Sequence, residues 1–200
     1  MRKAPRQERS RQMVERIVEA GRAVLARDGY ARFATTRVAE EAGISPGSLY
    51  QYFRNKDELL TVLMERYWAE LGDRVAASLA DHLTEPPEHL IPNAIEALLS
   101  ALERESRLLR VVVEEVPPAY SEEHLQNLRR RIQELGSAYL AGRAPGTRRG
   151  ATRSWVLVSA MEALSVRWVL DRPAIRREEL IEELTLLAAN YTAGTAGSTD

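Results

Sequence analysis

The stretch TTRVAEEAGISPGSLYQYFRNKDELL, residues 35–60, decides the fold because it carries three helix start signals in close succession. Thr35 or Thr36 can cap a first helix, and Gly43 can end that helix in a left-handed backbone conformation. Ser45-Pro46 then supplies an N-cap and a proline at the first helical position of a second helix. The first two helices are therefore expected to be joined by a tight turn.

A third helix is expected to begin directly after Asn55, because this residue and the glutamate three positions later have the spacing of a capping box. The two shorter helices before it have the spacing of a helix-turn-helix. Ala39 in the first helix and Gly43 in the turn allow a steep crossing, and Leu49 supplies an apolar anchor from the second helix. The sequence thus predicts a three-helix head with a helix-turn-helix at about residues 34–53.

The exposed side of the second helix has an unusual composition for a solvated helix. Its residues carry small side chains, hydroxyl groups and an amide in place of the glutamate and lysine that solvated helices favour. They are Pro46, Gly47, Ser48, Tyr50, Gln51 and Tyr52. Groups of this kind can approach base edges and phosphates closely, which favours a role in reading DNA.

Charge is unevenly distributed along the chain, although the net charge is only −1. Residues 1–56 hold 12 Lys and Arg against 6 Asp and Glu, a balance of +6, and residues 57–200 have a balance of −7. The basic part coincides with the helix-turn-helix, which favours a phosphate-binding face over a merely solvated surface.

Other function classes lack the residues that they need. The chain has no cysteine, only three histidines and no glycine pattern of the phosphate-cradling kind, so we expect no enzyme activity, no metal and no cofactor. No apolar run reaches the roughly 18 to 20 residues that a membrane helix needs, and the N-terminal segment lacks the pattern of a signal peptide. We therefore expect a cytoplasmic protein.

Apolar residues recur at helical spacing along nearly the whole chain, which predicts an all-α fold. Besides the two short helices, helices are expected at about 7–27, 55–83, 91–102, 107–116, 121–142, 155–170 and 176–191. The valine-rich segment 107–116 has strand propensity but is assigned to helix because no partner strand is predicted. Residues 1–8 and 193–200 are expected to be disordered.

The helix that begins after Asn55 is too long to belong to the head alone. Its first turn lies with the DNA-reading helices, while its later turns must pack into something else, so this helix is expected to couple two domains. We predict a DNA-binding domain at residues 1–56 and a second helical domain at residues 57–192.

The segment 155–170 is apolar nearly all the way round, so we expect it to be buried on two sides. Small residues along it would let a neighbouring helix approach closely. A dimer interface is therefore predicted on the last two helices. Its residues are Trp155, Ser159, Ala160, Ala163, Leu184 and Leu187.

Residues 17–64 together resemble the DNA-binding part of the TetR (tetracycline repressor) family of bacterial transcription regulators. The positions that carry the resemblance are Gly29-Tyr30, Ala39, Ala42-Gly43, Gly47, Leu49-Tyr50, Tyr52-Phe53, Lys56 and Leu59. One position departs from the family pattern, since similar sequences often have a threonine where this chain has Ala34. That departure leaves the first cap to Thr35.

The resemblance implies a homodimeric repressor that binds a palindromic operator in double-stranded DNA and is released by a small ligand, which we expect to be largely apolar. By this resemblance Thr36, Pro46, Gly47, Ser48 and Gln51 approach bases, and Tyr50, Tyr52 and Lys56 hold phosphates. Thr35, Arg37 and Ser45 complete the predicted DNA-contacting set. The second domain would hold the ligand, at Tyr67, Trp68 and Leu71 on the long helix, and would form the dimer.

Two alternatives stay open on the sequence. The protein could be an activator or a constitutive DNA-binding regulator that needs no ligand, or a helical protein-interaction module. Salt-dependent binding to DNA separates both DNA-binding hypotheses from the interaction module.

Overall fold

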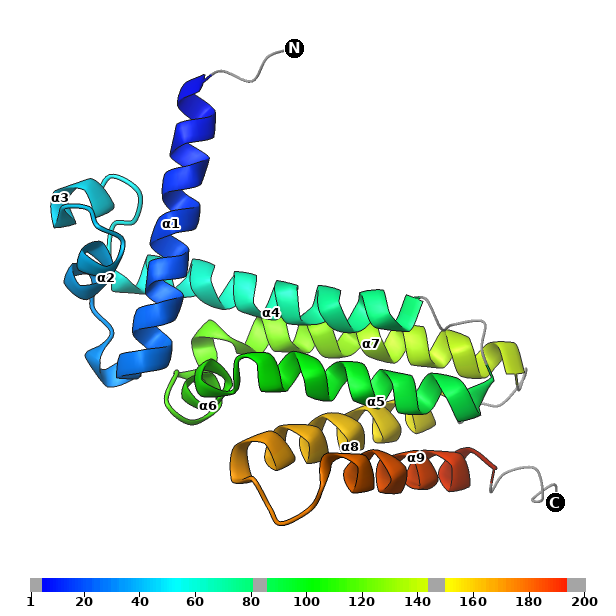
Figure 1. Ribbon diagram of the computed structural model, residues 1–200. Coiled ribbons are helices and arrows are strands. Elements are labelled where there is room, and N and C mark those ends of the chain that lie inside the picture. The colour runs from blue at the N-terminus through cyan, green and yellow to red at the C-terminus, as the bar shows by residue number, and fades with distance from the viewer. Residues whose placement is uncertain (1–4, 81–85, 144–149, 194–200) are drawn as a thin grey trace. The chain divides into compact units, whose positions relative to one another are not determined.

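The computed structural model describes residues 5–80, 86–143 and 150–193, and every regular element in these ranges is helical (Figure 1). In chain order the elements are α1 (Pro5–Asp28), the 3-10 turn η1 (Tyr30–Arg32), α2 (Thr35–Glu41), α3 (Pro46–Leu49), α4 (Lys56–Ala80), α5 (Pro87–Arg104), α6 (Ser106–Glu114), the 3-10 turn η2 (Pro118–Tyr120), α7 (Glu122–Arg143), α8 (Gly150–Asp171) and α9 (Arg177–Ala193). The predicted all-α fold is confirmed. The valine-rich segment is the helix α6, not a strand.

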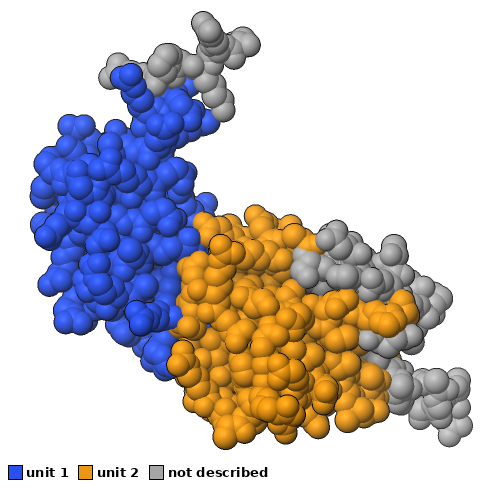
Figure 2. All heavy atoms as spheres, viewed as in Figure 1, with its two compact units in different colours: residues 1–68, 107–124 blue, residues 69–106, 125–200 orange. Residues whose placement is uncertain are grey.

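The described chain forms two compact units, which Figure 2 shows in different colours. The first comprises the described part of residues 1–68 together with residues 107–124, and the second comprises the described parts of residues 69–106 and 125–200. The division falls inside α4. The predicted boundary at residue 56 separates the chain by function and not by packing, and it stays a prediction.

The core of the first unit includes the apolar faces of α1 and the first turns of α4. Ile17, Val24 and Leu25 recur at helical spacing on α1 and are fully buried. Gly21 lies on the same helix, and a Cβ there would be 3.2 Å from a methyl carbon of Leu63 on α4, so the two helices approach closely. Helix α1 also packs on α2, and α2 packs on α3. The helix α1 is thus the support on which the helix-turn-helix is built.

Helix α6 and the turn η2 belong to this first unit although they lie far along the chain. Glu115, just past α6, accepts a hydrogen bond of 2.8 Å from the backbone N–H of Tyr30. Gly29 precedes that residue with φ 78°, and a Cβ there would lie 2.7 Å from the Glu115 carboxylate. In η2 the Tyr120 hydroxyl donates to Asp57, in the first turn of α4, over 2.7 Å. Helix α6 and the turn η2 therefore pack with the three-helix head, and the periodicity of apolar residues in the sequence does not reveal this packing.

In the second unit α5 packs on both α8 and α9. Arg177, the first residue of α9, donates to Glu96 over 2.6 Å and to Glu103 over 3.1 Å. The same guanidinium donates to the Ser100 hydroxyl over 2.8 Å. These acceptors lie on successive turns of α5, so one side chain fixes the start of α9 against that helix. The Trp168 indole N–H donates to a carbonyl in the connection between α8 and α9 over 3.0 Å.

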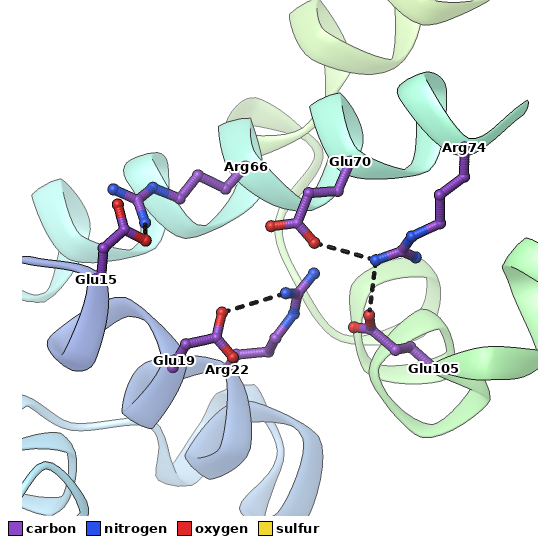
Figure 3. A network of polar contacts seen from close by, with 7 residues as sticks. All are labelled: Glu15, Glu19, Arg22, Arg66, Glu70, Arg74 and Glu105. Carbon is purple, nitrogen blue, oxygen red and sulfur yellow. Dashed lines mark hydrogen bonds and ion pairs between the residues drawn. The ribbon is translucent and has the colours of Figure 1, made fainter. Parts of the chain in front are cut away.

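Charged side chains of α4 form ion pairs in each unit (Figure 3). In the first unit Arg66 of α4 pairs with Glu15 of α1. In the second unit Arg74 pairs with Glu70 one turn earlier and with Glu105 at the end of α5. These pairs are partly exposed, so each contributes little stability on its own.

The helix boundaries differ from the predicted ones at both ends of the chain. Helix α1 begins at Pro5, so residues 5–8 are helical where the sequence predicts a disordered arm. A proline is compatible with the first turn because the N–H groups there have no partner within the helix. Helix α9 includes Ala193, which the sequence places in the tail. Residues 1–4 and 194–200 lie outside the described residues.

Candidate nucleic-acid interface

The start of α2 differs from the predicted cap. The N-cap residue is Ala34, in an extended conformation and without a side-chain cap hydrogen bond, so neither threonine caps this helix. Thr35 is the first helical residue, and its buried hydroxyl lies 3.0 Å from the hydroxyl of Tyr50. This contact joins α2 to the residue that follows α3. The threonine is used to connect the two helices of the motif and not to cap one of them.

The turn after α2 has the geometry that the sequence predicts. Gly43 has φ 64°, and its N–H and that of Ile44 donate to the carbonyls of Glu40 and Ala39 over 3.0 and 2.9 Å. This pair of bonds is a Schellman motif, which satisfies carbonyls at the helix end. Arg16 of α1 donates to the carbonyls of residues 42 and 43 in this turn, over 2.6 and 3.2 Å. The cation at this helix end is favourable for the helix dipole and fixes the turn on α1.

Helix α3 begins at the predicted cap but is shorter than predicted. The Ser45 hydroxyl accepts from the backbone N–H of Ser48 over 3.1 Å, and Pro46 occupies the first helical position. After Leu49 the chain continues with hydrogen bonds that span three residues as well as four, so the expected helix to residue 53 is replaced by a tighter turn. Leu49 itself is fully buried and is the predicted apolar anchor.

The predicted DNA-contacting residues differ in their exposure. Thr35 is buried, and Ser48, Tyr52 and Lys56 are half-buried. The exposed members are Thr36, Arg37, Ser45, Pro46, Gly47, Tyr50 and Gln51. The exposed members lie on α2, on α3 and in the segments adjoining α3, where they give the head a polar surface of small groups and one guanidinium.

The third helix start is also present. The Asn55 side chain accepts from the N–H of Glu58 over 2.8 Å, as predicted, but the Glu58 carboxylate accepts from the N–H of Arg54 over 2.6 Å and not from that of Asn55 as in a capping box. Lys56 then turns toward η1, where its ammonium donates to the carbonyl of Tyr30 over 3.3 Å. It also lies 4.1 Å from the centroid of that tyrosine ring, a cation–π contact. Lys56 therefore has two partners within the protein, the carbonyl and the ring of Tyr30. The sequence, which predicts a phosphate ligand at this position, does not reveal either of them.

Arg37 has a partner that the sequence does not reveal. Its guanidinium donates to the Asp28 carboxylate over 3.2 Å, and Arg27 donates to the same carboxylate over 3.0 Å. Hydrogen bonding from Arg27, followed by the charges of both arginines, holds the pKa of Asp28 below its ordinary value. Arg27 also pairs with Glu41 at the end of α2 over 2.7 Å. A charged cluster thus joins the end of α1 to the exposed face of α2.

The predicted ligand residues are all buried. Tyr67 and Trp68 make an edge-to-face ring contact with centroids 5.1 Å apart, and Leu71 is 4% exposed. The indole N–H of Trp68 is buried without a hydrogen-bond partner among the described residues. A buried donor without a partner is uncommon in folded proteins.

The predicted dimer residues fall into three groups. Trp155, Ala163 and Leu187 are exposed. The exposed fraction is 58% for Trp155 and 47% for Leu187. Ser159 and Ala160 are half-buried. Leu184 is already buried within the single chain, so it has little surface left for a partner.

Within the ranges that the structure describes, no group of three or more His, Asp or Glu side chains is placed to hold a metal ion. No helix in the same ranges is long and apolar enough to cross a membrane.

A helix-turn-helix supported by a third helix, with small polar groups exposed on and around the second helix of the motif, defines the class of DNA-binding transcription regulators. Comparison with family models identifies the particular group. Residues 17–63 match the family described as bacterial regulatory proteins, tetR family, and residues 86–191 match the tetracyclin repressor-like C-terminal domain. The chain belongs to the tetR family, whose members are regulators and not enzymes.

Curated relatives match the chain mainly over short stretches. The fatty acid metabolism regulator protein of Bacillus subtilis is 28% identical over 68 residues, which span 34% of this chain and 35% of that protein. The transcriptional regulator BetI 1 of Chromohalobacter salexigens is 35% identical over 82 residues, which span 41% of this chain and 39% of that protein. The chain thus matches well under half the length of these relatives.

A solved structure extends the likeness to nearly the whole chain. The transcriptional regulator FadR from Bacillus subtilis, in complex with stearoyl-CoA, has a TM-score of 0.66 and 15% identity, covering 90% of this chain and 98% of that one. At this identity the likeness concerns the fold alone.

Proposed function

We propose that the protein is a homodimeric repressor that binds a palindromic operator and leaves it when a small, largely apolar ligand binds. The observation that carries this proposal is the exposed surface around α3. Gly47 and Gln51 there are exposed, and α3 is held at one end by the Ser45 cap and anchored by buried Leu49. A short, rigidly supported element with small exposed groups suits insertion into a major groove.

The proposed division of labour follows the chemistry of each side chain. Thr36, Pro46, Gly47, Ser48 and Gln51 approach base edges, while Tyr50, Tyr52 and Lys56 contact phosphates with Thr35, Arg37 and Ser45 beside them. The hydrogen bond between Tyr50 and Thr35 supports this division, because it fixes the phenol that would meet a phosphate. Lys56 would have to exchange its contact with the Tyr30 carbonyl for a phosphate, or share it.

The proposed dimer uses exposed apolar side chains of α8 and α9. Trp155 and Leu164 are 58% and 43% exposed on α8, and Leu186, Leu187 and Tyr191 are 54%, 47% and 38% exposed on α9. Large apolar side chains that stay exposed on two neighbouring helices are typical of a region that packs against a partner. A second copy of this chain is the proposed occupant, because two heads on a palindrome need a two-fold partner.

The proposed ligand site includes Trp68. Its buried and unpartnered N–H could donate to one polar atom of an otherwise apolar molecule. The solved FadR structure contains stearoyl-CoA, so acyl-CoA thioesters and other amphipathic molecules with long chains are the first ligands to test. Tyr67 and Leu71 stay proposals on the same helix.

One experiment tests these proposals together. Genomic fragments selected by the purified chain would be searched for a palindrome, and binding to the recovered site would be measured with and without a series of acyl-CoA thioesters. We expect a palindromic site and release by at least one member of the series. Operator binding that no ligand of a broad screen weakens would favour the constitutive regulator, and an absence of DNA binding would favour the interaction module.

The dimer has its own test. Light scattering should give the mass of a dimer at micromolar concentration, and Leu187→Glu should give a soluble monomer. Ala163→Glu, at an exposed position on α8, should do the same. A wild-type monomer under these conditions would remove the dimer from the proposal.

A further inference from the structure

The guanidinium of Arg37 is held by a carboxylate of the head itself. The distance from its Nη1 atom to Asp28 Oδ2 is 3.2 Å. The two partners differ in accessibility, since the side chain of Arg37 is 51% exposed and that of Asp28 is 13% exposed. The aspartate is thus a fixed group near the surface, and the arginine is the part of the pair that a nucleic acid can reach.

Asp28 is in an unusual place for an acidic residue. It is the last residue of α1, where a negative charge is disfavoured by the helix dipole. Arg27 offsets this by donating to its carboxylate over 3.0 Å, and Arg27 also reaches Glu41 over 2.7 Å. Arg37 and Glu41 are one turn apart on the same face of α2. Two acids and two arginines therefore alternate along this surface, and their charges cancel.

This arrangement bears on how the head discriminates between DNA sequences. Binding to any duplex is driven mainly by arginines and lysines that replace counterions at phosphates. An arginine that is already paired with a carboxylate gains less from a phosphate, because the carboxylate repels the incoming charge. Arg37 gives only one of its N–H groups to Asp28, so its other N–H groups can still meet acceptors that an operator places correctly.

We propose that Asp28 is a specificity-determining residue. It restrains Arg37, so that this arginine adds little affinity for a duplex in which it can meet only phosphates. The proposal rests on the proposed DNA-binding role of the head. It deepens that role by assigning to one carboxylate the suppression of sequence-independent binding, a form of discrimination that acts against wrong partners.

The test uses Asp28→Asn, which keeps an oxygen acceptor for Arg37 and removes the charge. Affinity would be measured by fluorescence anisotropy for a selected genomic fragment and for a random duplex of equal length. The KCl concentration would be varied from about 50 to about 200 mM, so that the salt dependence of each binding constant can be determined. For the random duplex we expect about two- to fivefold tighter binding, the range of an exposed ion pair, and a log–log salt slope steeper by up to about 0.9. The selected fragment should gain less, so the ratio of the two affinities should fall.

Glu41→Gln is the matched control. It removes one negative charge from the same cluster, but its partner is Arg27 and not Arg37. A general effect of net charge would be equal in the two variants, whereas the proposal expects the larger effect from Asp28→Asn. In an Arg37→Gln background the effect of Asp28→Asn should fall to that of Glu41→Gln, because only the general effect of net charge is left once Arg37 is gone.

The outcomes are distinct. Equal effects of Asp28→Asn and Glu41→Gln, or an effect of Asp28→Asn that is undiminished in the Arg37→Gln background, would overturn the proposal. If Asp28→Asn does not fold by circular dichroism, Arg37→Gln alone decides: it should weaken binding to the selected fragment by a larger factor than binding to the random duplex, since a restrained cation contributes less there. Equal weakening on both duplexes would overturn the proposal. A wild-type chain with no salt-dependent DNA binding would instead be a failure of the proposed function.

Discussion

Replacing Gly29 by alanine should destabilise the first unit through two separate effects. Gly29 has φ 78° and ψ 170°, a region of backbone conformation that is essentially reserved for glycine. Forcing an alanine into it costs about 1 to 3 kcal/mol. The new Cβ would also lie 2.7 Å from Glu115 Oε2, so the carboxylate must leave the Tyr30 N–H to which it is bonded. The total loss should therefore exceed the loss from the backbone alone.

The assay is urea unfolding followed by circular dichroism, with the free energy taken from the linear dependence on denaturant. Gly29→Ala is compared in the wild type and in a Glu115→Ala background, where only the backbone effect should remain. Gly47→Ala is the control, because a Cβ there would have Ser45 Oγ 3.8 Å away, an ordinary contact. In helix α3 it should be neutral or stabilising by about 0.5 to 1 kcal/mol. An equal loss for Gly29→Ala in both backgrounds would refute the contact with Glu115, and a loss below about 0.5 kcal/mol would refute the strained backbone.

Three further predictions concern single groups. The pKa of Asp28 is lowered, so its contribution to stability is present above about pH 4 and is lost as the pH falls; unfolding free energies of Asp28→Asn should lack this part of the acid dependence. Donation to Asp57 raises the pKa of Tyr120 to about 12. An ultraviolet pH titration should therefore show one tyrosine that ionises at higher pH than an ordinary phenol, and this step should be missing in Tyr120→Phe. Trp68→Phe keeps a ring but removes the unpartnered N–H, so calorimetry should find weaker ligand binding, while operator binding without ligand stays unchanged.

Two of the three helix starts, and the end of the first helix, could be predicted because the chemistry that sets them is local. Ser45, Gly43 and Asn55 act on backbone groups within four residues, and the structure confirms each. The cap at Ala34 could not be predicted in the same way. Whether Thr35 turns its hydroxyl to its own helix or to Tyr50 depends on where α3 packs, which is a tertiary matter.

The contacts that sequence reasoning missed join residues without a periodic relation. Glu115 reaches Tyr30 across 85 residues, and Arg37 meets Asp28 across the turn η1. A surface glutamate or aspartate gives no sign of its partner in composition or spacing. One signal was available, since an aspartate at the end of a helix that is otherwise rich in arginine conflicts with the helix dipole and asks for a compensating partner.

The most direct test of the account is the salt dependence of binding between the full chain and a fragment recovered by genomic selection, set against a shuffled duplex of the same length. We expect the logarithm of the binding constant to fall linearly with the logarithm of the KCl concentration, with a slope of about −0.9 for each phosphate contacted. We also expect the selected fragment to bind on the order of a thousandfold or more tightly than the shuffled one at the same salt concentration. Equal affinity for both duplexes, or binding that does not depend on salt, would contradict the account.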